Sequence, residues 1–89
     1  MAHKKRTHIQ KYQAVVLSLS AATYQVTRTS LALDMGYKNG DPLKVVIEQL
    51  ISEGLVETTE GELFNRPIVW LWMNRANRKI ALKQIGYDE

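Results

Sequence analysis

The sequence predicts an α+β domain in which short helices precede a two-stranded antiparallel hairpin, with one more helix at the end. Between residues 27 and 56, two short helical patterns are separated by turn residues, and two extended segments then flank a glycine. The 89 residues are 45% hydrophobic and 24% charged, which is typical of one small globular domain. Cysteine is absent, which excludes a disulfide, a thiolate nucleophile and a zinc ribbon.

The first expected helix follows a basic arm. We expect residues 1–8 to form this flexible arm, residues 9–86 the folded domain and residues 87–89 a short tail. Apolar side chains recur at helical spacing where the folded domain begins, at Ile9, Tyr12, Val15, Val16 and Leu19. Residues 21–26 then have the extended character of a short strand.

Capping residues place the boundaries of the next two helices. Thr27 can accept a backbone N–H at the start of the first of them, and Gly36 can adopt the left-handed conformation that ends it. Residues 38–40 are typical of a turn. Asp41 is expected to cap the second helix of the pair, with Pro42 at its first position.

The second helix of the pair has one apolar stripe, and a hairpin follows it. The stripe consists of Leu43, Val46, Ile47, Leu50 and Ile51. Gly54 is expected to end the helix and Leu55 to begin a strand. Residues 59–62 are expected to form the hairpin turn, and residues 68–73 carry the strongest strand signal in the chain.

The last strand is apolar on both faces, with Ile68, Trp70 and Trp72 on one side and three apolar residues on the other. One face must line the core. The second face is expected to be covered by the last helix folding back over it, by a second copy of the chain, or by both together. For that last helix, Asn74 is the expected cap, and the expected apolar strip comprises Ala76, Ile80, Ala81 and Ile85. The expected homodimer interface comprises Trp70, Trp72 and Ile80.

Two segments occur in an order found in a known family, namely Leu31-Ala32-Leu33-Asp34-Met35-Gly36 and Leu50-Ile51-Ser52-Glu53-Gly54-Leu55-Val56. With them, residues 9–85 resemble the winged helix-turn-helix family. The resemblance implies a three-helix core, a small antiparallel sheet called the wing, a short first strand paired with it, and a C-terminal helix. It also implies sequence-specific binding of double-stranded DNA, by a transcriptional regulator or by a replication or partition factor of a compact genome.

The resemblance places base-reading residues at the turn and on the outer face of the second helix of the pair. These positions are Asn39, Lys44, Val45, Glu48 and Gln49. Lysine can reach guanine, glutamine adenine, and valine a thymine methyl group. Family members commonly have a basic residue where this chain has Val45. Cations expected on phosphates are Lys4, Lys5, Arg6, Lys11, Arg28 and Lys38, with Arg66 as the wing cation.

The charges are distributed unevenly along the chain, which leaves a second interpretation open. Residues 1–11 and 74–83 contain cations and no acids, whereas residues 41–62 contain six acids and one lysine. Glu60 and Glu62, expected at the wing tip, would be repelled by phosphate, so insertion of the wing into DNA is disfavoured. The alternative function is a protein-interaction adaptor or DNA mimic, in which an acidic helix and wing bind a basic partner.

Catalytic groups do not converge in this sequence. His3 and His8 are both expected in the arm, the serines lack a histidine partner in the folded part, and no glycine-rich phosphate loop occurs. We therefore expect no enzymatic activity, no metal and no cofactor. The longest apolar run, residues 67–73, is too short to span a membrane. The expectation is a cytoplasmic, nucleoid-associated DNA-binding protein, dimeric and without a membrane partner.

Overall fold

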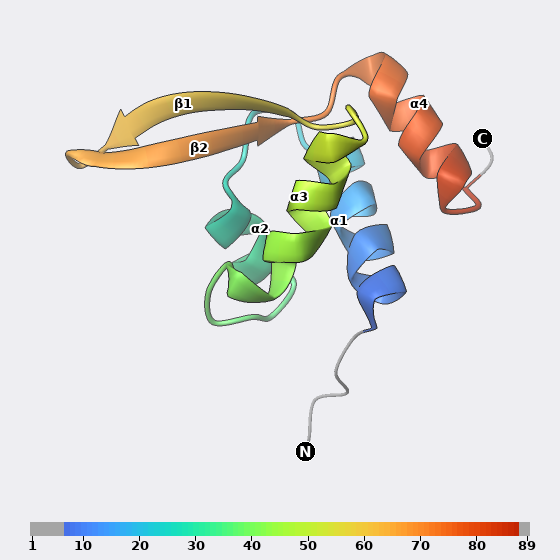
Figure 1. Ribbon diagram of the computed structural model, residues 1–89, viewed down its shortest axis with the longest axis horizontal. Coiled ribbons are helices and arrows are strands. Elements are labelled where there is room, and N and C mark those ends of the chain that lie inside the picture. Colours follow the sequence, from blue (N-terminus) through green and yellow to red (C-terminus); the bar gives the residue numbers. More distant parts are fainter. Residues whose placement is uncertain (1–6, 88–89) are drawn as a thin grey trace.

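The computed structural model describes residues 7–87, and in these residues four α-helices and a 3₁₀ turn accompany one antiparallel hairpin (Figure 1). The elements are α1 (His8–Ala21), α2 (Arg28–Asp34), η1 (Asp41–Leu43), α3 (Lys44–Ser52), β1 (Glu57–Leu63), β2 (Arg66–Trp72) and α4 (Arg75–Gln84). This order confirms the α+β class. The arm residues Lys4, Lys5 and Arg6 lie outside the described residues.

Side-chain caps fix the starts of three helices. In α1, Thr7 Oγ1 accepts from the backbone N–H of Gln10 at 3.1 Å, and the Gln10 side chain accepts from the Thr7 N–H at 2.9 Å. This capping box starts α1 at His8, so His8 is a helical residue and its expected place in the arm is wrong. The caps predicted at Thr27 for α2 and Asn74 for α4 are both confirmed.

The entry to α3 differs from the expectation. Asp41 does not cap the helix, because Leu43 occupies the N-cap of α3 and no side chain caps it. The backbone N–H of Asp41 donates to Asn39 Oδ1 at 2.9 Å. Gly40 precedes a 3₁₀ turn, in which Pro42 lies, and α3 proper begins at Lys44. The Asn39 side chain thus closes the turn locally, as asparagine commonly does.

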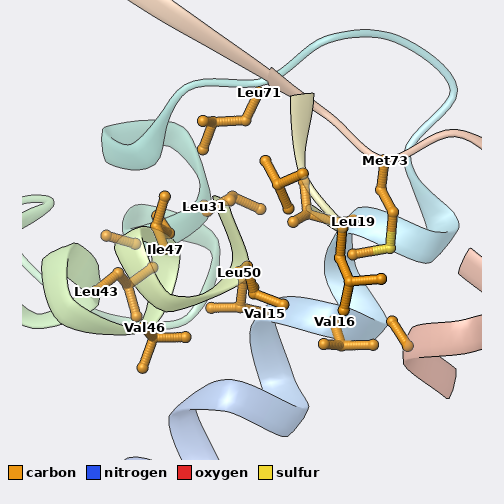
Figure 2. Packing of buried hydrophobic residues seen from close by; sticks show 14 residues of the cluster. Val15, Val16, Leu19, Leu31, Leu43, Val46, Ile47, Leu50, Leu71 and Met73 are labelled. Carbon is orange, nitrogen blue, oxygen red and sulfur yellow. The ribbon is translucent and has the colours of Figure 1, made fainter. Parts of the chain in front are cut away.

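The core lies where α1, α2 and α3 meet the base of the hairpin (Figure 2). Its buried residues are Val15, Val16, Leu19, Leu31, Ala32, Leu43, Val46, Ile47, Leu50, Leu55, Val56, Leu71, Met73 and Ala81. The stripe predicted for α3 is confirmed in its first four members. Its fifth member, Ile51, is 39% exposed, because it lies at the edge of the buried face.

The hairpin turn is not where the sequence placed it. Strands β1 and β2 pair from Glu57 opposite Trp72 to Leu63 opposite Arg66, so residues 59–62 are strand and not turn. The turn is formed by Phe64 and Asn65, which have φ angles of 51° and 63°. The expected first strand is reduced to one bridge, between Val26 and Leu71.

Helix α4 packs against α1 and extends away from the hairpin (Figure 1). On the second face of β2 it covers only the last residue, Trp72, over which Arg78 lies, so the expected folding back over this face is wrong for the rest of the strand. The apolar strip predicted on α4 is also partly wrong, because Ala76 and Ile80 are exposed while Ala81 is buried. The helix turns Ala81, Leu82 and Ile85 toward the core instead.

Candidate nucleic-acid interface

Helix α3 presents one face to solvent because its other face is fully used by the core. Val46, Ile47 and Leu50 are buried. At 100° per residue, this orientation turns Lys44, Val45 and Glu48 outward, and all three are exposed. Val45 is 64% exposed, which places an apolar side chain among charged ones on this face.

The turn between α2 and α3 brings Arg28 close to this face. Gly40 is buried, and a Cβ atom built on it would lie 2.9 Å from Arg28 Nε and 3.1 Å from Arg28 Cγ. A side chain at this position would displace the Arg28 side chain, which crosses the turn here. Lys38 and Asn39 are exposed on the same turn.

A groove of about 380 Å³ runs between the start of α2, the outer side of α3 and strand β2. Arg28, Lys44 and Glu48 are its charged lining residues, and Ile47 and Leu71 are among its apolar ones. The structure thus brings together two of the predicted DNA-contact cations, although they lie 16 positions apart in the sequence.

Gln49 is placed differently from the other predicted base-reading residues. It is half-buried on the α1 side of α3, and a 2.6 Å hydrogen bond joins its Oε1 to His8 Nε2. Its Nε2 donates to Glu53 Oε2 at 3.5 Å. The Gln49 amide is therefore held toward α1.

Tyr12 extends this polar contact to α4. Its hydroxyl donates to Glu53 Oε1 at 2.6 Å and lies 3.1 Å from Gln84 Oε1. Burial, followed by the hydrogen bond and charge of Glu53, raises the pKa of Tyr12 far above its ordinary value. Helical spacing identified Tyr12 only as an apolar position, and no local signal in the sequence indicated its partners.

Two of the three acidic residues of β1, Glu60 and Glu62, share a face with the groove. The strand register places Glu60 opposite Val69 and Glu62 opposite Pro67, and both Val69 and Pro67 line the groove. The expected acidic tip is therefore wrong, because Phe64 and Asn65 form the tip and the two carboxylates lie along β1. Arg66, the predicted wing cation, begins β2 beside the tip and is exposed.

Solved structures share this arrangement of elements. A MarR family regulator from Neisseria meningitidis, NMB1585, superposes with a TM-score of 0.62 at 20% identity, covering 83% of this chain and 50% of that one. The protein smu.1704 from Streptococcus mutans superposes with a TM-score of 0.70 at 8% identity, covering 93% of this chain and 79% of that one. The chain has the winged helix-turn-helix fold. It spans half the length of the Neisseria protein. No family model matches the sequence, and no curated protein matches it.

In this winged helix fold, α2, the turn and α3 are the helix-turn-helix, and the β1–β2 hairpin is the wing. One wing face carries the two tryptophans predicted at a dimer interface. The Trp70 ring lies against Gly61, where an added Cβ would be 3.2 Å from Trp70 Nε1. The Trp72 ring lies beneath the Arg78 guanidinium, whose carbon is 4.6 Å from the ring centroid.

Arg78 was not singled out from the sequence, yet it joins three elements. Its guanidinium donates to the carbonyl oxygens of Met73 at 2.7 Å, Ser20 at 3.0 Å and Ala22 at 2.8 Å. Ile80, the third residue predicted at the dimer interface, lies two positions further along α4 and is 49% exposed. A separation of two positions turns Ile80 to the opposite side of the helix from Arg78.

Residues 7–87 contain neither a metal-binding cluster nor a membrane-spanning helix. The side chains described there include no group of three or more His, Cys, Asp or Glu residues placed to hold a metal ion. Within the same part of the chain, no helix is long and apolar enough to cross a membrane.

Proposed function

We propose that this protein binds double-stranded DNA with α3 in the major groove, as a transcriptional regulator or as a replication or partition factor. The observation that carries the proposal is the exposed α3 face beside two cations, Arg28 and Lys44, at a groove between helix and wing. Recognition helices of helix-turn-helix proteins dock with their N-terminal residues on base edges. The fold likeness to a protein named a MarR family regulator adds support.

In this mode the contacts divide into two kinds. Lys44 and Val45 face base edges, because they begin α3 and point outward. Arg28 and Lys38 contact phosphates from either side of the turn, and Lys4, Lys5 and Arg6 of the arm add charge along the backbone. Asn39 lies at the turn beside them, whereas Gln49 reaches a base only if it releases His8.

We further propose that two copies associate through the wing. A two-stranded hairpin is marginally stable alone, and here Val69 is 47% exposed on one face while Trp70 is half-buried on the other. A second copy packed on Trp70 and Trp72 would remove the exposed part of the tryptophan face from water. Ile80 lies on α4 and would take part only if that helix also meets the partner. A dimer would present two α3 helices to half-sites roughly 34 Å apart, and this function would place the protein at the nucleoid.

A second candidate function rests on the acids of the wing. Glu60 and Glu62 lie on the groove side of the sheet, and Glu48 lines the groove itself. A basic protein segment in the groove would meet these carboxylates, as in the adaptor or DNA-mimic alternative.

Titration of random-sequence duplex DNA at several salt concentrations tests the first function. The logarithm of the affinity should fall linearly with the logarithm of salt. Lys44→Ala should cost about 1 to 3 kcal/mol on the best selected duplex and little on random DNA. Lys79→Ala, an exposed cation on α4, is the matched control and should change neither affinity.

Charge reversal of the wing separates the two functions. Changing Glu57, Glu60 and Glu62 together to lysine should strengthen binding to duplex DNA if DNA is the partner. The same triple change should abolish capture of a basic polypeptide, such as polylysine, if the wing is an adaptor surface. Absence of any duplex binding by the unaltered protein would overturn the DNA proposal.

A further inference from the structure

The wing ends in a large apolar side chain that nothing covers. Phe64 is 89% exposed, and its neighbour Leu63 is 45% exposed. Figure 1 shows the hairpin as an arm that extends away from the helices, with this turn at its far end. Phe64 belongs neither to the buried core nor to the residues packed against it.

The backbone at Phe64 is also unfavourable for phenylalanine. A two-residue hairpin turn of this kind requires positive φ at both central positions, which asparagine, aspartate and glycine tolerate best. Asn65 fits this requirement, but Phe64 at φ 51° does not. A bulky residue in a strained and exposed position stabilises neither turn nor core, so a role in binding is the better explanation.

The residues beside Phe64 indicate what it contacts. The turn and its flanks, residues 63–67, contain Asn65 and the cation Arg66 and no acid. Proteins that enter the minor groove combine arginine or asparagine, which hydrogen-bond there, with an apolar wedge that separates stacked bases. The tip has all three of these elements in consecutive positions.

The length of the wing fits the distance to be covered. Each strand has seven residues, which span about 20 Å at the usual rise per residue. The minor groove next to an occupied major groove lies about half a helical turn away, roughly 17 Å. Glu62 and Glu60 lie two and four positions before Phe64 along β1, so repulsion from phosphates limits entry to the tip.

We propose that Phe64 inserts between base pairs from the minor groove and bends the DNA, with Asn65 and Arg66 contacting the groove beside it. This inference rests on the proposed function, because α3 in the major groove positions the wing. The bases at the inserted step lose stacking on each other and gain stacking on the Phe64 ring.

Because of the turn conformation, Phe64 can be replaced without a loss of stability, so that any loss of binding is due to the missing side chain. Phe64→Asn relieves the backbone, so this variant should unfold at the same or higher denaturant concentration than the unaltered protein. On the best duplex selected from a random pool, it should bind roughly fivefold or more weakly. In duplexes with single 2-aminopurine substitutions, the unaltered protein should increase the 2-aminopurine fluorescence at the base step that it unstacks, and Phe64→Asn should not. The DNA bend, measured by energy transfer between the two DNA ends, should be smaller with Phe64→Asn than with the unaltered protein.

Two further variants act as matched controls. Phe64→Tyr keeps an aromatic ring and should retain the fluorescence signal and the bend. Arg66→Gln should lower the salt slope by about one phosphate contact, whereas Phe64→Asn should leave that slope unchanged.

Each other outcome has a distinct meaning. If duplex binding depends on Lys44 but is equally tight for the unaltered protein and for Phe64→Asn, with no unstacked base, the wedge is wrong and the proposed function stands. If Phe64→Asn converts a dimer into a monomer in sedimentation, the tip contacts a second copy and the wedge is overturned. If the unaltered protein binds no duplex, both proposals fail together.

Discussion

The helical core and the wing differ in how their apolar residues are used. In the core, Leu19, Leu43 and Leu50 are at most 1% exposed and contact residues from several elements. In the wing, Val69 is 47% exposed and Phe64 89% exposed. Core residues are thus explained by the stability of one chain, whereas burial within one chain does not explain the exposed apolar residues of the wing. This contrast separates the residues that stabilise the fold from those that the binding proposals concern.

The largest expected effect is in the core. Leu50→Ala removes a side chain that is fully buried between α3 and the rest of the core, and should lower the free energy of unfolding by about 2 to 5 kcal/mol. Val69→Ala in the wing should lower it by less than about 1 kcal/mol, because half of that side chain already contacts water. Urea titration of both variants measures the difference. Equal losses would show that the wing is as tightly packed as the core.

The second largest effect on stability is expected at Arg78, which lies where the core and the wing meet. Arg78→Lys keeps the charge but cannot reach three carbonyl oxygens in the planar arrangement of a guanidinium. We expect a loss of about 1 to 3 kcal/mol, because carbonyls at the end of α1 lose their partner. Lys79→Arg, on the exposed neighbouring position, should change stability by less than about 0.5 kcal/mol. A Trp72 fluorescence change in Arg78→Lys would show that the stacked ring moves as well.

A smaller effect is expected at a helix start within the core. Thr27→Ala removes the side-chain oxygen that accepts from the Ser30 N–H at 3.0 Å. The expected loss is about 1 kcal/mol, which is typical of an N-cap. Thr29→Ala in the same helix removes a hydroxyl of an exposed residue and serves as the control. A loss at Thr29 as large as at Thr27 would mean that the cap is not the cause.

Features determined by near neighbours in the sequence were predicted more often than features determined by distant ones, although the local cap expected at Asp41 is wrong. The caps at Thr27 and Asn74 depend on residues three positions away, so local chemistry identifies them. The wing turn was misplaced at Gly61, because glycine favours turns. The strand register decides otherwise, and places Gly61 under the Trp70 ring.

The residues of the candidate site also divide into those predicted from near neighbours in the sequence and those that depend on distant ones. Lys44 and Val45 were predicted on the outer face of α3 because the apolar stripe fixes which way that helix turns, and both are exposed. The contact of His8 with Gln49 joins residues 41 positions apart, and that of Tyr12 with Gln84 joins residues 72 positions apart. Such pairs form only when the chain has folded, so helical periodicity alone could not identify them.

The smallest expected effect on stability at neutral pH is that of changing Tyr12, whose hydroxyl joins α1 to the end of α3 by a hydrogen bond to Glu53. Its pKa is raised above the ordinary value of 10.0, so the folded protein keeps the hydroxyl proton at a pH where the unfolded chain releases it. The stabilisation by Tyr12 is therefore complete below pH 10.0 and decreases as the pH rises above that value. Tyr12→Phe removes this decrease. Urea titrations from neutral to alkaline pH should show the unaltered protein losing stability faster than Tyr12→Phe above about pH 10. If the stabilities of the two proteins changed equally with pH, the Tyr12 hydroxyl would titrate alike in the folded and unfolded chains. Its hydrogen bond to Glu53 would then not retain the Tyr12 proton.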